Sequence, residues 1–290
     1  MAKFYAMLSY ITWDFDPVVF NISISEHDWS LRWYGLLFAS GFIVGQQMLF
    51  YLFSRDGKSR QSVDILTIYI IVATIVGARL GHYLFYEWPL LIDYPVNWLV
   101  ELVTPPFAGL ASHGAAIALL VAVYLYSRKY KDQPYLWVLD RLAVGAPIIG
   151  ALIRLGNLFN SEIYGTPTAL PWGFLFVRET DPALLPIVPR HPTQLYEALF
   201  CVFLFLLTFY LWKRKRDVLP DGVITGTFLI LLFTSRFLIE FLKNNQVDFE
   251  SDYLINMGQL LSLPAIAMGV AVILYAYRTG GKANPVQQQS

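Results

Sequence analysis

The feature that most constrains this chain is a series of long apolar stretches. A run of about 20 apolar residues is long enough to cross the hydrocarbon core of a bilayer as a helix. Seven stretches meet that length, and we therefore expect an all-α integral membrane protein with seven transmembrane helices. The expected spans are residues 31–54, 63–86, 107–127, 137–157, 193–212, 222–242 and 254–277.

The composition agrees with a membrane protein and argues against other classes. Of the 290 residues, 56% are hydrophobic and only 14% are charged, against roughly 25% charged residues in soluble domains. The formal net charge is zero, so no overall positive field favours nucleic acid as a partner. We expect residues 1–278 to form one polytopic domain, followed by a short disordered cytoplasmic tail at 279–290.

The distribution of lysine and arginine predicts the orientation of the chain. Most of the 21 basic residues lie after the first, third, fifth and seventh spans, including the run at 213–216. Because basic residues concentrate in cytoplasmic loops, the N-terminus is expected outside and the C-terminus in the cytoplasm. The first thirty residues and the outside segments 87–106 and 158–192 are expected to lie at the membrane interface, where Trp and Tyr settle.

Polar side chains gather where the fourth span ends, in RLGNLFNSEIYG (154–165). Arg154 and Asn157 are three residues apart and share one face of a helix, and Glu162 follows the helix end. A charge at membrane depth is costly unless it is paired or hydrated. The cluster is therefore either an ion-pair staple between helices or a site for a polar ligand, and the extra amides favour a site.

Two histidines mark further candidate positions. His113 lies in the third span among small residues that leave room for a substrate chain or another helix, although a lone histidine in a membrane also bonds to backbone carbonyls. His191 stands before Pro192 in RHPTQLYE (190–197), which opens the fifth span because proline suits the first turn of a helix. Helix capping explains only part of that motif.

Arginine recurs near the outer ends of the spans. Arg79 lies in the second span, Arg190 precedes the fifth, and Arg236 lies in the sixth, one helical turn before Glu240, with which it can pair. Arginine binds phosphate through its planar donor fork, so these side chains predict a lateral pocket for an anionic phospholipid. Tyr34, at the start of the first span, is either an interfacial anchor or part of this pocket.

The sequence offers little for a metal ion or a nucleotide. It has no cysteine cluster and no paired histidine spacing, which are the usual signs of a metal site. It also lacks a phosphate-binding glycine loop on the cytoplasmic side. No metal and no cofactor is therefore expected.

These motifs resemble, in order along almost the whole chain, those of bacterial prolipoprotein diacylglyceryl transferases. GALIRLGNLFNSEIYG (150–165) is similar to the family signature Arg-x-Gly-Asn-Phe-x-Asn-x-Glu-x-x-Gly. Leu158, Ile153 and Ala115 depart from the usual residues, and these changes concern packing more than chemistry. The further matches are LRWYG (31–35), GARLG (77–81), the His-Gly of ASHGA (111–115), RHPTQLYE, SRFLIEF (235–241) and MGQLLSLP (257–264).

The resemblance implies a seven-helix enzyme of the bacterial inner (cytoplasmic) membrane, with its active site toward the outer leaflet. Such an enzyme transfers the diacylglyceryl group of phosphatidylglycerol to the lipobox cysteine of a preprolipoprotein signal peptide, forming a thioether and releasing glycerol phosphate. The resemblance also implies functional roles for Arg154, Asn157, Glu162, Gly165, His113, Tyr34 and Arg236.

The resemblance and the polar clusters together give the candidate site. The catalytic candidates are His113, Arg154, Arg236 and Tyr34. The candidates for binding phosphatidylglycerol are Arg154, Asn157, Glu162, Gly165, Arg79, His191, Arg236 and Glu240. His113 is the first candidate for the base that takes the thiol proton, and the alternative is that it holds Tyr34 or a headgroup oxygen in place.

Two other classes stay open at this point. A membrane transporter of an anionic lipid or small anion also clusters arginines, but its charged residues are expected to continue into the cytoplasmic half. A seven-helix receptor does not need several arginines near lipid phosphate. Oligomeric state does not follow from the sequence.

Overall fold

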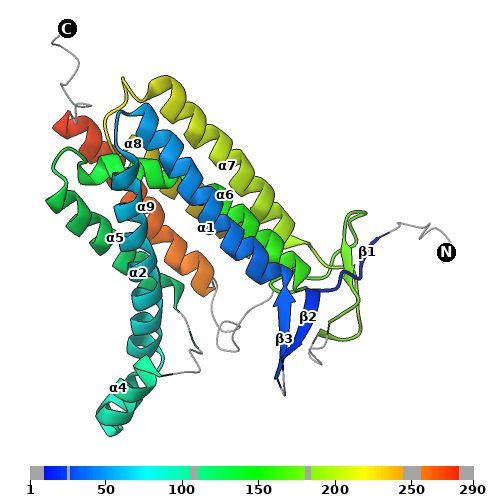
Figure 1. The fold of residues 1–290 in the computed structure, drawn as a ribbon. Helices are drawn as coiled ribbons and strands as arrows, with labels where there is room; N and C mark the ends of the chain where they lie inside the picture. Colours follow the sequence, from blue (N-terminus) through cyan, green and yellow to red (C-terminus); the bar gives the residue numbers. More distant parts are fainter. Residues whose placement is uncertain are drawn as a thin grey trace. The chain divides into compact units, whose positions relative to one another are not determined.

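The computed structural model describes residues 10–24, 27–104, 109, 111–179, 184–243 and 256–280, and most of them are helical (Figure 1). The expected disordered tail falls almost entirely outside the described residues. The strands are β1 (Ile11–Trp13), β2 (Val18–Ile24), β3 (His27–Arg32) and β4 (Phe174–Phe176). The helices are α1 (Trp33–Arg55), α2 (Arg60–Phe85), α3 (Trp88–Asp93), α4 (Pro95–Val103), α5 (Ser112–Lys129), α6 (Tyr135–Phe159), α7 (Thr193–Lys215), α8 (Val223–Glu240) and α9 (Met257–Thr279).

Six helices in the described part of the chain are long and apolar enough to cross a membrane, namely α1, α2, α6, α7, α8 and α9. The expected span 107–127 corresponds to α5, which is not one of the six. α5 begins only at Ser112 and ends with Arg128 and Lys129. Its apolar stretch from Gly114 to Tyr126 is about 20 Å long at 1.5 Å per residue, which is shorter than a hydrocarbon core of about 30 Å.

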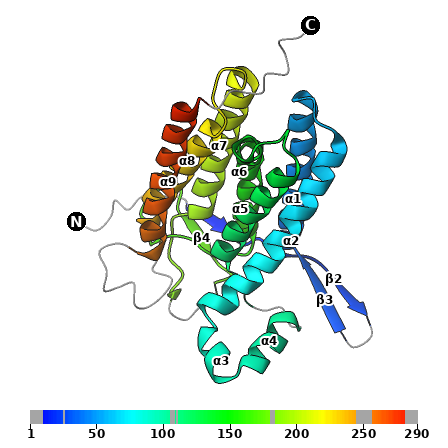
Figure 2. The same ribbon diagram turned by 90° about the vertical axis from the view of Figure 1, so that its left-hand side faces the viewer.

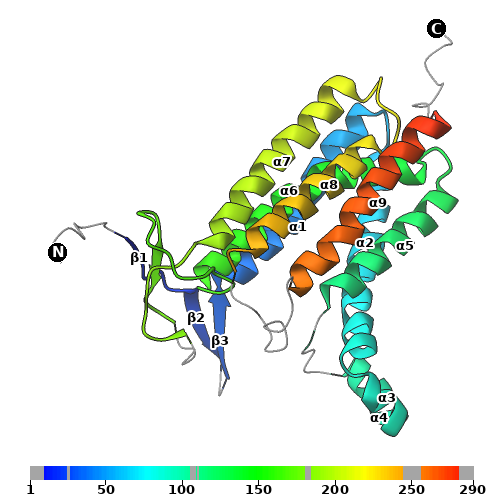
Figure 3. The ribbon, with the colours of Figure 1, turned by 180° about the vertical axis from the view of Figure 1, so that it is seen from behind.

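Internal contacts divide the chain into two compact units. The first unit is Met1–Gln47 with Leu142–Ser290, and the second is Met48–Arg141. In the second unit α2 packs against α5 (Figure 3). A Cβ at Gly81 would lie 2.6 Å from Gly114 Cα, and one at Gly77 would lie 2.7 Å from the Gly114 carbonyl oxygen. The spacing Gly77-xxx-Gly81 thus lets the two helix backbones approach closely, as in membrane helix pairs.

Two ion pairs in the second unit, one buried and one exposed, join the C-terminal end of α1 to the N-terminal end of α6. Arg141 pairs with Asp56 at 2.7 Å, and its guanidinium lies 3.9 Å from the centre of the Trp137 ring. Lys58 pairs with Asp132 at 2.8 Å, and its hydrogen bond lowers the pKa of the Asp132 carboxyl group. Removing one partner of the buried Arg141–Asp56 pair would leave an uncompensated charge, so this pair fixes the two helix ends.

The segment after α2, expected at the membrane interface, forms the two short helices α3 and α4 (Figure 2). Each has a proline in its first turn, where the missing N–H costs nothing and the fixed φ suits a helix.

In the first unit, α7 packs on α8 and α8 packs on α9 (Figure 3). The contact between α8 and α9 again uses glycines, because a Cβ at Gly226 would lie 2.6 Å from the Gly269 carbonyl oxygen. α1 meets α6 at Gly41, where a Cβ would lie 3.1 Å from Ile149 Cγ2. These close approaches set the distances between the helices that carry the candidate residues.

Four short strands of the first unit were not expected from the sequence. β2 and β3 form an antiparallel hairpin that leads into α1, and β1 pairs with β4 in parallel. Phe174 and Phe176 of β4 form an apolar cluster with Leu158 and Tyr164. Trp13 packs on the cluster and donates from Nε1 to the Leu158 carbonyl at 3.0 Å. The described residues of the segment 158–192 thus pack on an apolar cluster next to the end of α6.

Candidate functional site

The turn that follows α6 is conformationally strained. Ser161 and Ile163 have positive φ angles of 54° and 59°, in a left-handed region that is unusual for a β-branched residue. Each such residue costs on the order of 1–3 kcal/mol and persists only where the surroundings fix it. Glu162, between them, is therefore held in a defined position.

Glu162 accepts hydrogen bonds from the amides around it. Its Oε1 accepts from Asn157 Nδ2 at 2.8 Å and from Asn160 Nδ2 at 3.3 Å. Its backbone carbonyl accepts from Gln194 Nε2, at the start of α7, at 2.6 Å. Asn157 Oδ1 accepts in turn from Arg154 Nη1 at 3.4 Å. Arg154 and Asn157 do share one face of α6, and Asn157 links the arginine to Glu162.

Arg154 takes its ion-pair partner from α7. Its Nε lies 2.9 Å from Glu197 Oε2. The other oxygen, Glu197 Oε1, accepts a 2.8 Å hydrogen bond from Lys243 Nζ, which lies 3.5 Å from Glu240 Oε2. Glu197, Lys243 and Glu240 are all buried. These four side chains of alternating charge, Arg154, Glu197, Lys243 and Glu240, form what we term the buried charge chain.

Glu240 does not pair with Arg236 as the sequence suggested. Its carboxylate contacts Lys243 and the first turn of α9, where a Cβ at Gly258 would lie 2.6 Å from Glu240 Cδ. The N-terminal end of a helix stabilises a negative charge, so α9 offers Glu240 a better setting than its own helix does. Within the described residues, half-buried Arg236 has neither a hydrogen bond nor an ion pair, which leaves its guanidinium available to an anion.

Gly165 lies where two backbone segments nearly touch. Its N–H donates to the His191 carbonyl at 2.8 Å, and Thr166 N–H donates to the Leu242 carbonyl at 2.7 Å. A Cβ at Gly165 would clash with that same Leu242 carbonyl oxygen and would lie 2.8 Å from His191 Cβ. Only glycine fits this position, which places the segment after α8 against the loop that follows α6.

Tyr34 lies at the contact between α1 and α6. A Cβ at Gly156 would lie 2.9 Å from Tyr34 Cδ2 and 3.2 Å from its Cα. Gly156 is two residues from Arg154 and adjacent to Asn157, so the absence of a side chain there brings Tyr34 next to the polar cluster.

His191 belongs to a short hydrogen-bonded series at the start of α7. Trp172 Nε1 donates to Tyr196 Oη at 3.0 Å, and Tyr196 Oη lies 3.2 Å from His191 Nδ1. Because the tyrosine oxygen already accepts from Trp172, its own proton is free to be donated to a neutral imidazole. Burial lowers the pKa of His191, in the same direction as this hydrogen bond to the neutral form.

The two remaining candidates, Arg79 and His113, lie in the second unit. Arg79 donates from Nη2 to the Glu101 carbonyl at 2.6 Å and from Nε to the Leu102 carbonyl at 3.1 Å. It thus holds the C-terminal turn of α4, where a cation is favourable. His113 is the second residue of α5, and its ring meets Phe85 edge to face at 4.7 Å. In the described part of the chain, its nitrogens have no hydrogen-bond partner, a backbone carbonyl included.

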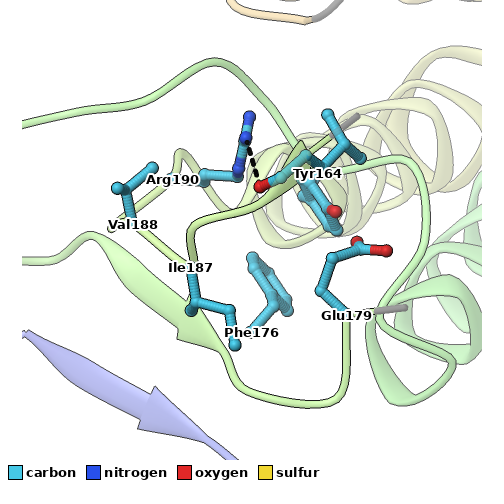
Figure 4. A pocket seen from close by; sticks show the side chains of 7 residues that line it. Tyr164, Phe176, Glu179, Ile187, Val188 and Arg190 are labelled. Atoms are coloured by element: carbon cyan, nitrogen blue, oxygen red, sulfur yellow. Dashed lines mark hydrogen bonds between the residues drawn. The ribbon is translucent and has the colours of Figure 1, made fainter. Parts of the chain in front are cut away.

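A small pocket lies beside the loop that follows α6 (Figure 4). Arg190 donates from Nη2 to the Leu184 carbonyl at 3.3 Å and lies 5.4 Å from the centre of the Tyr164 ring. The volume that the centre of a water molecule can occupy there is about 10 Å³, enough for about one water, so the pocket does not hold a lipid headgroup. It is lined by Tyr164, Phe176, Glu179, Leu184, Ile187, Val188 and Arg190.

The cluster around Arg154 carries the residue types of the signature seen in the sequence, and comparison with known proteins identifies the family. The profile of the family described as prolipoprotein diacylglyceryl transferase matches residues 17–275. The chain belongs to this family.

Named relatives cover the chain almost end to end. A phosphatidylglycerol–prolipoprotein diacylglyceryl transferase of Porphyromonas gingivalis is 42% identical over 292 residues, which is 97% of this chain and 98% of the relative. The protein of that name from Chloroherpeton thalassium is 40% identical over 275 residues, covering 93% and 96%. The one from Tolumonas auensis is 38% identical over 265 residues, covering 90% and 96%.

Two residues of the buried charge chain, Glu197 and Lys243, were not assigned to the site from the sequence of this diacylglyceryl transferase. Glu197 appeared there only as part of RHPTQLYE, and Lys243 was not singled out. The signal that could have found them is their charge within or beside apolar helices, which requires a partner. The sequence alone does not indicate that Glu197 pairs with Lys243, since the two residues are 46 positions apart.

Proposed function

We propose that this protein transfers the diacylglyceryl group of phosphatidylglycerol to the lipobox cysteine of preprolipoproteins. The observation that carries the proposal is the Arg154 cluster, in which an arginine, two asparagines and a carboxylate that match the family signature are held together by hydrogen bonds. The names of the relatives supply the two substrates. The chain thus acts as a multi-pass transferase of a bacterial inner membrane.

Arg154 and Arg236 are proposed to bind the phosphate of the lipid. Arg236 has no partner among the described residues, and Arg154 is held at one edge by Glu197 and Asn157. A guanidinium presents five donors in a fixed fork, so an arginine paired at one edge still offers donors to a phosphate. Asn157 and Glu162 are proposed to hold the hydroxyls of the headgroup glycerol.

Five other candidates are proposed to shape the headgroup site. Gly165 brings the segment after α8 into contact with the loop after α6. His191 and Tyr34 line the approach to the polar cluster, and Glu240 completes the buried charge chain. Arg79 acts by holding α4 in the second unit.

The proposed chemistry is a substitution at carbon. The cysteine thiol loses its proton, and the resulting thiolate attacks the glyceryl carbon that carries the phosphate ester. A C–S bond forms while the C–O bond to the phosphate breaks, and glycerol phosphate leaves with the bonding electron pair. Negative charge grows on the departing phosphate, and arginines fixed in a water-poor site stabilise that charge better than water does.

His113 is proposed as the base that takes the thiol proton. Free cysteine is mostly protonated at neutral pH, so the thiolate has to be favoured by a base or by nearby positive charge. The nitrogens of His113 have no hydrogen-bond partner within the described residues, so one of them is available to accept a proton. The alternative is that His113 positions Tyr34 or a headgroup oxygen while the arginines favour the thiolate.

The membrane arrangement belongs to the same proposal. Residues 1–278 act as one catalytic domain with seven membrane helices, α5 being the seventh. The N-terminus lies outside, the C-terminus lies in the cytoplasm, and the site faces the outer leaflet. The asymmetry of the basic residues along the sequence supports this orientation. The β2–β3 hairpin, α3, α4 and the segment 158–192 are then on the outer side.

Purified protein mixed with phosphatidylglycerol and a lipobox peptide tests the function. Formation of a diacylglyceryl thioether on the peptide cysteine, with release of glycerol phosphate, is the expected result. A peptide with serine in place of the cysteine is the control and should stay unmodified. If lipid crosses the bilayer of vesicles that contain the protein while no thioether forms, the protein is a transporter and the proposal is wrong.

A further inference from the structure

Lys243 is a buried cation outside the family signature. Its side chain is only 4% exposed, and Nζ lies 2.8 Å from Glu197 Oε1 and 3.5 Å from Glu240 Oε2. An ammonium group taken out of water is tolerated only where carboxylates compensate its charge. A neutral side chain at this position would have a lower desolvation cost. The positive charge of Lys243 is therefore expected to have a role of its own.

Lys243 and Arg154 share one carboxylate. Glu197 Oε1 lies 2.8 Å from Lys243 Nζ, and Glu197 Oε2 lies 2.9 Å from Arg154 Nε. The strength with which Glu197 holds Arg154 thus depends on how far Lys243 neutralises the same carboxylate. Since Arg154 is the proposed phosphate ligand, an anion that binds its other edge shares its positive charge with Glu197.

The backbone brings Lys243 to this position through Gly165. The two residues form an antiparallel bridge, and the neighbouring hydrogen bond from Thr166 N–H to the Leu242 carbonyl is 2.7 Å long. A side chain at Gly165 would push Leu242 away. The glycine that ends the signature is therefore also the residue that allows Lys243 to reach Glu197.

We propose that Lys243 is a positioning residue, which partly neutralises Glu197 and so leaves more of the positive charge of Arg154 available to the phosphate of the lipid at the other edge of the guanidinium. Without Lys243, Glu197 has Arg154 as its one remaining cation among the described residues and retains it more firmly. The lipid then binds more weakly, while the bond-breaking step with lipid in place changes less. This inference rests on the proposed function for the identity of the lipid.

The test compares Lys243→Met, Lys243→Gln, Glu197→Gln and the double variant Lys243→Met/Glu197→Gln. The assay gives KM for phosphatidylglycerol and kcat, and calorimetry in detergent gives Kd for a short-chain phosphatidylglycerol. Contacting charged groups couple by amounts that correspond to about tenfold in affinity. We expect KM and Kd to rise about tenfold in Lys243→Met and Lys243→Gln, with kcat within about threefold of wild type.

The double variant separates positioning from a merely structural role. Removing the charge of Glu197 as well takes away the group that retains Arg154, so KM and Kd should return to within about threefold of wild type. A purely structural lysine would give a double variant at least as impaired as Lys243→Met. Lys58→Met is the control, since it breaks a more exposed lysine ion pair of the same length, 2.8 Å, in the second unit, and it should leave KM unchanged.

The variants separate the role of Lys243 from the proposed transferase function. Unchanged KM and Kd in both single lysine variants, or no recovery in the double variant, would overturn the role of Lys243. If Lys243→Met does not fold, Lys243→Gln and its double variant with Glu197→Gln give the same comparison. Wild-type protein without transferase activity refutes the proposed function alone, because the Kd series still tests whether Lys243 controls binding of the lipid.

Discussion

The Nε atom of Arg154 lies 2.9 Å from Oε2 of Glu197, and this ion pair ties α6 to α7 at the polar cluster. The arginine side chain keeps 23% of its surface exposed, against 8% for the glutamate. Its second contact, from Nη1 to Asn157 Oδ1, is 3.4 Å long, near the limit for a hydrogen bond. The guanidinium is thus anchored at one edge and weakly engaged at the other.

This geometry predicts that lysine does not replace arginine at position 154. An ammonium group is a point charge and cannot pair with Glu197 and bind phosphate through a fork at the same time. Hydrogen bonds to charged groups contribute about 1.5–3 kcal/mol, so Arg154→Lys should lower kcat/KM roughly tenfold to a hundredfold. The melting temperature should stay close to that of wild type. Wild-type turnover in Arg154→Lys would remove the phosphate role.

Arg236 and Arg141 should respond in opposite ways to the same change. Arg236 has no partner among the described residues, so Arg236→Gln should lower activity and leave thermal stability unchanged. Arg141 is buried and paired with Asp56 at 2.7 Å. Arg141→Gln leaves that carboxylate uncompensated and should destabilise the protein by about 3–5 kcal/mol. Thermal unfolding and the transferase assay, run on both variants, compare them directly. A large loss of stability in Arg236→Gln would show that this arginine is structural.

The contrast between these arginines shows what the sequence could and could not predict. Apolar runs of about 20 residues located the long helices, and the spacing of three residues placed Arg154 and Asn157 on one face. Pairing between distant segments was not available from such local patterns, so Glu197 was not recognised as the partner of Arg154. Arg236 and Glu240 were expected to pair because they are one helical turn apart. In the structure the Glu240 carboxylate instead contacts Lys243 and the N-terminal turn of α9.

The hairpin of β2 and β3 was missed for a different reason. Residues 20–24, Phe-Asn-Ile-Ser-Ile, alternate between apolar and polar side chains, which is the period of a strand. The high aromatic content of the region favoured an interfacial segment, and the shorter period was overlooked. The span 107–127 was predicted from its apolar length, but α5 covers only part of it and has polar ends, so the seventh span stays a prediction.

The contact of Gly156 with Tyr34 predicts a cost for the smallest added side chain. A methyl group at position 156 would lie 2.9 Å from the tyrosine ring and 3.2 Å from its backbone, so α1 and α6 have to move apart. Gly156→Ala should destabilise the protein by about 1–3 kcal/mol and lower activity. Gly35→Ala is the matched control, because a Cβ there meets nothing within 4 Å; alanine in a helix should leave stability equal or higher. Equal melting temperatures for the two variants would contradict the close packing.

His191 predicts a loss of stability at mildly acidic pH. Its pKa is lowered from 6.5 by burial, so the unfolded chain takes up the proton at a higher pH than the folded protein does. Stability is therefore fully present above pH 6.5 and decreases as the pH falls below that value toward the folded-state pKa. The decrease in melting temperature between pH 7.5 and 5.5 should be smaller in His191→Gln than in wild type. Tyr196→Phe, which removes the hydrogen bond to Nδ1, should also reduce this pH dependence. Identical pH profiles for wild type and His191→Gln would exclude the histidine as the source.

The last prediction distinguishes the two roles proposed for His113. The ring contacts Phe85 at 4.7 Å, and no hydrogen bond holds its nitrogens within the described residues. If the imidazole accepts the thiol proton, His113→Gly should lower kcat by about a hundredfold or more, since general base catalysis contributes 10²–10⁴-fold. Added free imidazole should restore part of kcat, because it can occupy the vacated space and take the proton. If His113 instead positions Tyr34 or the headgroup, KM for phosphatidylglycerol should rise and imidazole should restore nothing. His82→Gly, in the same unit and with its ring 5.6 Å from that of Tyr86, is the control for unspecific effects of imidazole. Rescue of that variant to the same extent would remove the case for His113 as the base.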